Sequence, residues 1–213
     1  MNAQLLYFAG LAFPVENLGP GRRVVIWLEG CSLNCSGCMS PDLFARKHPV
    51  GVGEVARQTL AHLEVADGLT ISGGEPFQQP AAVTSLVRHL RELLPVEVLV
   101  YSGLTKEEIL AGSAAQRDLL RLVDILIDGR FESTVSNTKH WRGSDNQRVH
   151  LLSDRARKYA GLTDRPFPPK RVLHVQPLEG MRVRLIGIPE RDHWMRLREA
   201  PRVRASALRQ ECE

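Results

Sequence analysis

The sequence RVVIWLEGCSLNCSGC, residues 23–38, joins an apolar run to a group of cysteines. Residues 23–28 are short, β-branched and largely apolar, and they stop at Glu29-Gly30, which is typical of a buried strand. The loop that follows carries Cys31, Cys35 and Cys38 in the spacing C-x3-C-x2-C. We therefore expect three thiols to leave the end of one core strand together.

Three cysteines on so short an arc can surround one metal centre, since Gly30 and Gly37 let the chain fold tightly. A disulfide would leave one of the three unpaired, and nothing in the sequence indicates an oxidising compartment. Structural zinc normally takes four protein ligands, and the remaining candidates are the distant Cys212 and His48. Thiolates favour iron–sulfur clusters, and a four-iron cubane held by three cysteines keeps one iron open to a ligand. The spacing favours a cluster, with zinc as the alternative.

Composition and length fit a globular protein of one domain, or one domain with an appendage. The chain has 213 residues, of which 43% are hydrophobic and 24% charged, which argues against disorder and fibrous designs. No stretch approaches the roughly 18 apolar residues of a membrane-spanning helix. The apolar N-terminal run lacks the preceding positive charge of a signal peptide. We expect a cytoplasmic protein without a membrane partner.

Charge is distributed unevenly along the chain. The segment 1–110 carries 8 Lys and Arg against 11 Asp and Glu, whereas the segment 111–213 carries 20 against 13. A basic half can steer an acidic partner. Its arginines alternate with acidic residues and few aromatics, so no nucleic-acid-binding module is evident. A solvated, arginine-rich surface is the simpler interpretation.

Strand-like and helix-like segments alternate along the chain from Leu5 to Ile127. Apolar runs predict strands at 5–15, 23–28, 69–71, 96–101 and 125–127, and helical spacing predicts helices at 53–64, 80–94 and within 105–122. A capping box at Thr105 and Glu108 begins the last of these. Such alternation indicates parallel βαβ units, with ligands bound at the carboxyl ends of the strands. The expected fold class is α/β, an incomplete parallel (β/α) barrel.

The alternation weakens after residue 131. A strand is predicted at 148–152, a proline-containing linker at 160–170, and a hairpin from 171–175 and 181–188. A short helix near 190–199 and an arginine-rich tail complete the chain, and chain ends of this kind are often poorly ordered. We expect a main domain over residues 1–159 and an extension over 160–213.

A second motif shows what the cysteine loop resembles. The turn ISGGEP, residues 71–76, follows the next predicted strand, and its pairing with C-x3-C-x2-C resembles the radical S-adenosylmethionine (SAM) superfamily. Four further segments resemble the activating proteins of anaerobic ribonucleotide reductase, which activate a glycyl radical enzyme: NLGPG (17–21), VYSGLTKEE (100–108), DILIDGRF (124–131) and WRGSDNQR (141–148). The resemblance spans about residues 4–152.

The resemblance implies a [4Fe-4S] cluster held by Cys31, Cys35 and Cys38, with SAM on the open iron. In that family an electron cleaves SAM to a 5′-deoxyadenosyl radical, which abstracts hydrogen from a backbone glycine of the partner enzyme. A flavodoxin or ferredoxin would supply the electron. The hard chemistry then belongs to the cofactors, and no catalytic residue beyond the cluster and cofactor ligands is implied.

The resemblance also implies six cofactor-binding residues, namely Gly73, Gly74, Glu75, Pro76, Ser102 and Asp128. The glycines would let backbone carbonyls approach the methionine ammonium, which the charge of Glu75 would help to hold. Ser102 and Asp128 follow strand ends, where they would lie near the methionine carboxylate or the ribose. Ordinary cap and turn chemistry is the alternative for these two residues.

Two other functions stay open. A small-molecule radical SAM enzyme resembling 7-carboxy-7-deazaguanine synthase would be similarly short, but that family tends to carry Trp-Cys-Asp where this chain has Gly37-Cys38-Met39. A zinc-stabilised binding module, with a basic half that contacts nucleic acid, is the alternative from another class. We favour an oxidoreductase that activates a glycyl radical enzyme.

Overall fold

The computed structural model describes residues 4–135, 137–166, 173–178 and 182–187. Its strands are β1 (Leu5–Val15), β2 (Arg23–Leu28), β3 (Pro49–Gly51), β4 (Gly68–Gly73), β5 (Val98–Tyr101), β6 (Ile125–Asp128), β7 (Arg148–Leu151), β8 (His174–Leu178) and β9 (Arg182–Ile186). Its α-helices are α1 (Val52–Leu63), α2 (Pro80–Leu93), α3 (Lys106–Ala111) and α4 (Ala114–Leu120). One sheet has the order β3-β1-β2-β4-β5-β6-β7, and β8 pairs with β9 in a second sheet.

The centre of the large sheet is parallel, as the alternation of strands and helices predicts. Strands β2, β4, β5 and β6 pair in parallel, whereas β1, β3 and β7 pair antiparallel at the two sides. The short connection from β1 to β2 permits only antiparallel pairing, because a parallel pair needs a long crossover. The α/β class with a mostly parallel sheet is confirmed. The described strands form an open sheet and no closed barrel.

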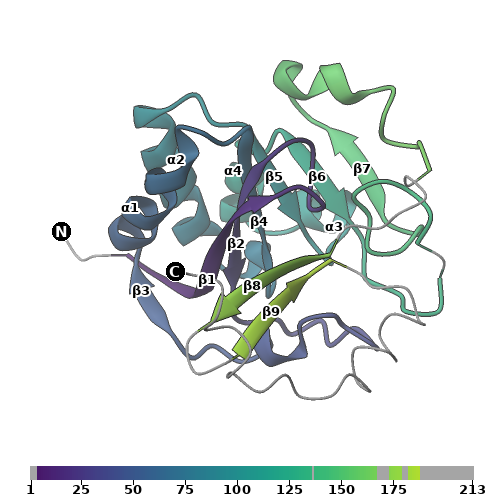
Figure 1. The fold of residues 1–213 in the computed structure, drawn as a ribbon, viewed down its shortest axis with the longest axis horizontal. Coiled ribbons are helices and arrows are strands. Elements are labelled where there is room, and N and C mark those ends of the chain that lie inside the picture. Colours follow the sequence, from purple (N-terminus) through teal and green to yellow (C-terminus); the bar gives the residue numbers. More distant parts are fainter. Residues whose placement is uncertain (1–3, 136, 167–172, 179–181, 188–213) are drawn as a thin grey trace, which may run out of the picture.

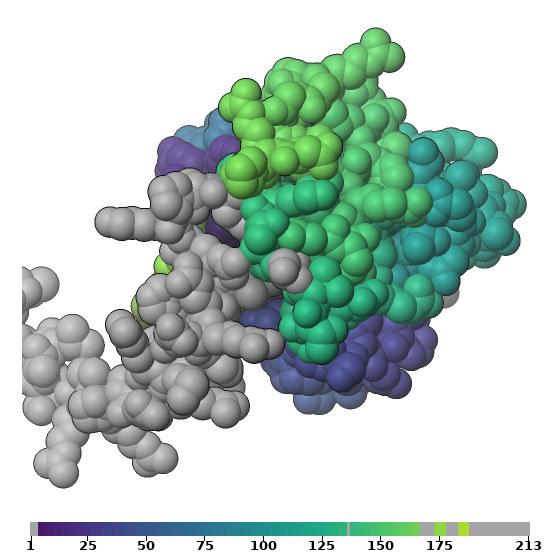
Figure 2. All heavy atoms as spheres, turned by 90° about the vertical axis from the view of Figure 1, so that its right-hand side faces the viewer, coloured from purple at the N-terminus to yellow at the C-terminus, as the bar shows by residue number. Residues whose placement is uncertain are grey.

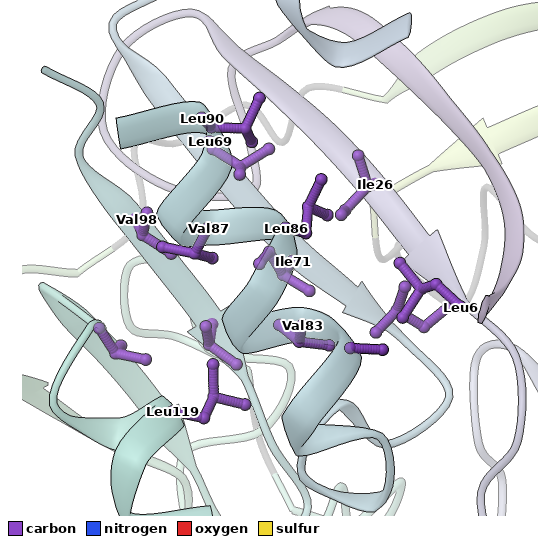
Figure 3. Close-up of a cluster of buried hydrophobic side chains, with 14 of the residues drawn as sticks. Leu6, Ile26, Leu69, Ile71, Val83, Leu86, Val87, Leu90, Val98 and Leu119 are labelled. Carbon is purple, nitrogen blue, oxygen red and sulfur yellow. The ribbon is translucent and has the colours of Figure 1, made fainter. Parts of the chain in front are cut away.

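The two faces of the sheet are covered by different parts of the chain. In Figure 1, α1 and α2 lie together to the left of the sheet, and the β8–β9 hairpin lies below its centre. Alternate residues of a strand point to opposite faces, so Ile26 joins the core beneath the helices while Trp27 faces the other side. Figure 3 shows the helix-side core, where α2 contributes Val83, Leu86, Val87 and Leu90.

Capping boxes mark the first residues of helices α3 and α4. The predicted capping box is present at the start of α3, where Thr105 accepts from the amide of Glu108 and the Glu108 carboxylate accepts from the amide of Thr105. A second capping box at Ser113 starts α4, so the predicted helical stretch is two helices separated at Gly112. The antiparallel strand β7 also lies where the sequence predicts it.

A hairpin is present as predicted, but β8 lies three residues later than the predicted strand 171–175 and β9 is shorter than the predicted strand 181–188. Its inner face contacts β1. The Gln176 amide donates to the Leu11 carbonyl over 3.0 Å, and the buried Ile186 packs with Val25 and Trp27. The predicted helix at 190–199 and the tail lie outside the described residues, and the division at residue 159 stays a prediction. No helix in the described segments is both long enough and apolar enough to cross a membrane. The cytoplasmic location stays a prediction.

Candidate functional site

A cavity of about 910 Å³ lies at the carboxyl ends of the parallel strands. Its wall combines the loop after β2, the strand ends, the segment after β6 and strand β9, and includes Trp27, Cys35, Cys38, Gly73, Ser102, Gly129, Trp141 and Arg184. Figure 2 shows the green segment after β6 directly above the blue-violet segment after β2. This is the edge at which open α/β sheets bind ligands.

The cysteine loop is held tightly at its base and at its turn. The amides of Gly30 and Cys31 donate to the carbonyls of Leu43 and Phe44 over 2.8 and 3.0 Å. Gly37 has φ +73°, and a Cβ there would lie 2.6 Å from the Ser133 hydroxyl. Only glycine fits this close approach, so position 37 has no room for an aromatic side chain.

The three thiols are half-buried and close enough to influence one another. Burial raises the pKa of Cys31, and the charges of Glu75, Cys35 and Cys38 raise it further. Burial also raises the pKa of Cys38, again with a contribution from Cys35. Thiolates gathered in this way repel one another, so a cationic centre between them relieves the repulsion. The donor set therefore fits an iron–sulfur cluster.

The three thiols do not converge on one point in this structure. Across the described segments, no group of three or more Cys, His, Asp or Glu side chains is arranged to hold a metal ion. His48, the nearby candidate for a zinc ligand, lies with Nδ1 2.6 Å from a Glu29 carboxylate oxygen. Cys212 lies outside the described residues.

The two glycines of the G-G-E-P turn bring β4 against the cysteine loop. A Cβ on Gly73, which has φ +103°, would lie 2.5 Å from the Leu28 backbone, and one on Gly74 would lie 2.5 Å from the Gly30 carbonyl. The Gly74 amide donates to the Leu28 carbonyl over 2.7 Å, and the Glu75 amide donates to the Gly30 carbonyl over 2.8 Å. Gly73 is therefore required by its close contact with the end of β2, and Gly74 by its close contact with the start of the cysteine loop. Gly73 also lines the cavity.

Glu75 and Ser102, two of the predicted cofactor residues, contact each other. The Ser102 hydroxyl donates to Glu75 over 2.9 Å, and the amides of Gly103 and Phe77 donate over 2.8 and 3.0 Å. The Glu75 side chain is 1% exposed, and burial raises its pKa to about 7. Ser102 lines the cavity, whereas Glu75 and Pro76 are buried and do not line it.

Asp128 also lies behind the cavity wall, although the next residue, Gly129, lines the cavity. Its fully buried carboxylate accepts from the Arg148 guanidinium over 2.6 and 3.0 Å and from the Lys106 amide over 2.6 Å. Burial by itself raises the pKa of Asp128, but these hydrogen bonds outweigh burial, so the pKa is lowered overall. The structure thus groups Asp128 with Arg148 and not with Glu75 and Ser102.

Several cavity residues were missed by the sequence analysis. Trp27 and Tyr101 lie at or next to strand ends, and the two-residue period of β2 and β5 is a signal that could have placed them on this face. The Tyr101 hydroxyl donates to the Trp141 carbonyl over 2.5 Å. Arg184 comes from the distant hairpin, and no local pattern identifies it.

Comparison with known proteins gives a consistent result. A family model described as 4Fe-4S single cluster domain matches residues 17–150. The anaerobic ribonucleoside-triphosphate reductase-activating protein of Enterobacteria phage T4 is 32% identical over 142 residues, covering 64% of this chain and 88% of that protein. Its counterpart in Escherichia coli (strain K12) is 29% identical over 154 residues, covering 66% and 96%. About a third of this chain, chiefly beyond residue 150, therefore lies outside these matches.

Proposed function

Because the chain belongs to the 4Fe-4S single cluster domain family, and to the activase-like radical SAM family of the anaerobic ribonucleotide reductase-activating proteins, we propose that it is a radical SAM enzyme that activates a glycyl radical enzyme. The observation that carries the proposal is the contact between the cysteine loop and the G-G-E-P turn. The backbone bonds from Gly74 and Glu75 to β2 and Gly30 place the two motifs at one edge of one cavity.

In this proposal Cys31, Cys35 and Cys38 hold a [4Fe-4S] cluster, and the cavity beside them holds SAM. When both are bound, they supply one-electron cleavage of SAM to a 5′-deoxyadenosyl radical. The protein orients SAM and excludes water. Gly73 and Ser102 would contact SAM directly in this proposal, which is supported by their place in the cavity wall.

The predicted cofactor residues that do not line the cavity would support the contact with SAM indirectly. Glu75 orients the Ser102 hydroxyl and the Gly103 amide at the cavity edge, and Pro76 begins the turn that follows. Asp128 would act by fixing the Lys106 amide and Arg148 behind Gly129. The parallel strands β2, β4, β5 and β6 then correspond to part of an incomplete barrel that is open toward the cavity.

The proposed partner is a glycyl radical enzyme such as an anaerobic ribonucleotide reductase, with a flavodoxin or ferredoxin as the electron donor. The names of the related proteins support the reductase. The net positive charge of residues 111–213 would favour docking of an acidic protein surface. The oxidoreductase activity would take place in the cytoplasm.

The first prediction concerns Cys35. Anaerobic reconstitution with iron and sulfide should give a brown protein that releases 5′-deoxyadenosine from SAM when reduced. Replacing Cys35 with alanine should remove the cluster absorbance and this release, because a cluster ligand is lost. The matched control Cys212→Ala should retain both. A colourless protein that binds stoichiometric zinc and cleaves no SAM would instead identify the zinc-stabilised module.

A small-molecule substrate is the second candidate function. Its support is the cavity volume of about 910 Å³, which lies in the range of small-ligand sites. The reductase assay separates the two candidates. Mixing the reduced, SAM-loaded protein with a co-encoded reductase should produce a glycyl radical signal in electron paramagnetic resonance. SAM cleavage without that signal would favour the small-molecule enzyme.

A further inference from the structure

Arg184 places a guanidinium in the cavity wall from a part of the chain that the family model does not cover. It lies on β9 (Arg182–Ile186), whereas the family-model match ends at residue 150. Its guanidinium stacks on the Trp27 ring at 4.9 Å from the centroid. Side chains alternate between the two faces of a strand, and Gln176, Arg184 and Ile186 lie on the inner face of the hairpin. The exposed Val175 and Val183 lie on its outer face.

The Arg184 guanidinium is half-buried, but its hydrogen bonds are weak. Its Nη atoms lie 3.4 Å from the Gln176 side-chain oxygen and 3.3 Å from the Ala9 carbonyl, both long for hydrogen bonds. Among the residues that the structure describes, no carboxylate forms an ion pair with Arg184. Burial lowers the pKa of Arg184, and the charge of Asp42 only partly opposes this shift.

The other positively charged or ionisable basic groups in the cavity wall differ from Arg184. Arg142 pairs with Asp164 at 3.0 Å, and His48 contacts Glu29 at 2.6 Å. Lys47 is exposed to solvent. Gly10 leaves room for the guanidinium, because a Cβ at that position would lie only 3.4 Å from both Nη atoms. The wall thus accommodates a cation that, within the described segments, lacks a paired counter-ion.

We propose that Arg184 is an anion-binding residue of the cavity, which holds a carboxylate or phosphate group of a bound molecule. A planar guanidinium supported by an aromatic ring suits bidentate binding of such groups. The anion would supply the opposite charge and offset the desolvation of the cation. The hairpin would thereby determine which molecules the cavity retains.

The anionic group has two possible sources, the methionine carboxylate of SAM or an acidic group of the substrate. The first source rests on the proposed function, while the second needs only the cavity. Affinities of the reconstituted protein for SAM, decarboxylated SAM, succinate and inorganic phosphate should be measured by calorimetry at constant ionic strength. Wild type, Arg184→Met and Arg184→Lys should be compared, with Arg88→Met on the exposed face of α2 as the matched control.

The expected result is a loss of anion affinity of about tenfold or more in Arg184→Met. A loss for SAM but not for decarboxylated SAM assigns Arg184 to the cofactor carboxylate. An unchanged affinity for SAM with lost succinate or phosphate binding assigns it to the substrate. Arg184→Lys should retain part of the anion affinity. If Arg184→Met does not fold, the comparison of Arg184→Lys with the wild type provides the test.

Equal affinities of wild type and both Arg184 variants for every probe would overturn the inference. An equal loss in Arg88→Met would also overturn it, because the effect would then be one of net charge. If wild type binds succinate or phosphate but not SAM, the radical SAM proposal fails while the anion site stands. The two failures are therefore distinguishable.

Discussion

Two buried ionisable side chains show what single residues contribute to this site. Arg23 at the base of the sheet is fully buried, and its guanidinium donates to Thr70 Oγ1, the Leu69 carbonyl and Glu97. Glu75 at the opposite end of the parallel strands is also buried, but its carboxylate receives only neutral donors. A charge without an opposite charge is the more costly to bury, so Glu75 is the group whose ionisation should affect folding.

We predict that Glu75 makes stability pH-dependent near neutrality. Its pKa is raised from 4.5 to about 7 in the folded protein, so the folded state binds more protons than the unfolded state between these values. The free energy of unfolding should therefore decrease as pH rises through this window, by on the order of 3 kcal/mol.

Urea denaturation of the wild type and Glu75→Gln at pH 5 and pH 7.5 measures this effect. The difference between the two proteins should change with pH, because Gln does not ionise. The exposed Glu64→Gln is the matched control and should follow the wild type. Parallel pH dependences for wild type and Glu75→Gln would contradict the prediction.

At the scale of elements, the contact between the end of β4 and the cysteine loop depends on glycine. A Cβ on Gly74 would lie 2.5 Å from the Gly30 carbonyl oxygen, which belongs to backbone that cannot move away cheaply. Gly74→Ala should therefore displace the loop and lower the iron bound after reconstitution several-fold. Iron and sulfide analysis measures this loss.

Gly53 in α1 is the matched control for this substitution. A Cβ at Gly53 has no atom within 4 Å, and alanine is favoured over glycine within a helix. Gly53→Ala should bind as much iron as the wild type and be slightly more stable. A Gly74→Ala protein with full iron content would show that the loop tolerates the displacement.

At the scale of the whole molecule, the sheet is enclosed from both sides by chain segments of different origin. The helices between the parallel strands cover one face, while residues 137–166 and the β8–β9 hairpin cover parts of the other and leave the cavity between them. The hairpin packs against the rest of the protein through its inner face, where Ile186 is 4% exposed and packs with Val25 and Trp27.

We predict that Ile186→Ala releases the hairpin from the sheet without unfolding the domain. Removal of a buried Ile side chain costs about 2–5 kcal/mol, and a two-stranded hairpin is marginal alone. Limited proteolysis should cut residues 173–187 faster, and succinate or phosphate affinity should decrease with Arg184 displaced. Val175→Ala on the exposed outer face should change neither property. Unchanged proteolysis of Ile186→Ala would show that other contacts hold the hairpin.

The sequence by itself determined the parallel centre of the fold and the two motifs that meet at its edge. Strands β2, β4, β5 and β6 and helices α1 and α2 are visible because the apolar periods of neighbouring residues follow local geometry. The cysteine spacing and the G-G-E-P turn are likewise continuous segments, and the expected family was confirmed.

Only the tertiary structure decided which side chains reach the cavity. Glu75 is enclosed by Ser102 and Gly103, Asp128 is bound by Arg148, and Arg184 reaches Trp27 from the distant β8–β9 hairpin. These contacts join residues that are far apart in the chain, so no local pattern encodes them. They follow from the packing of whole elements, because burial and the pairing of polar groups are settled only when the strands, loops and hairpin come together.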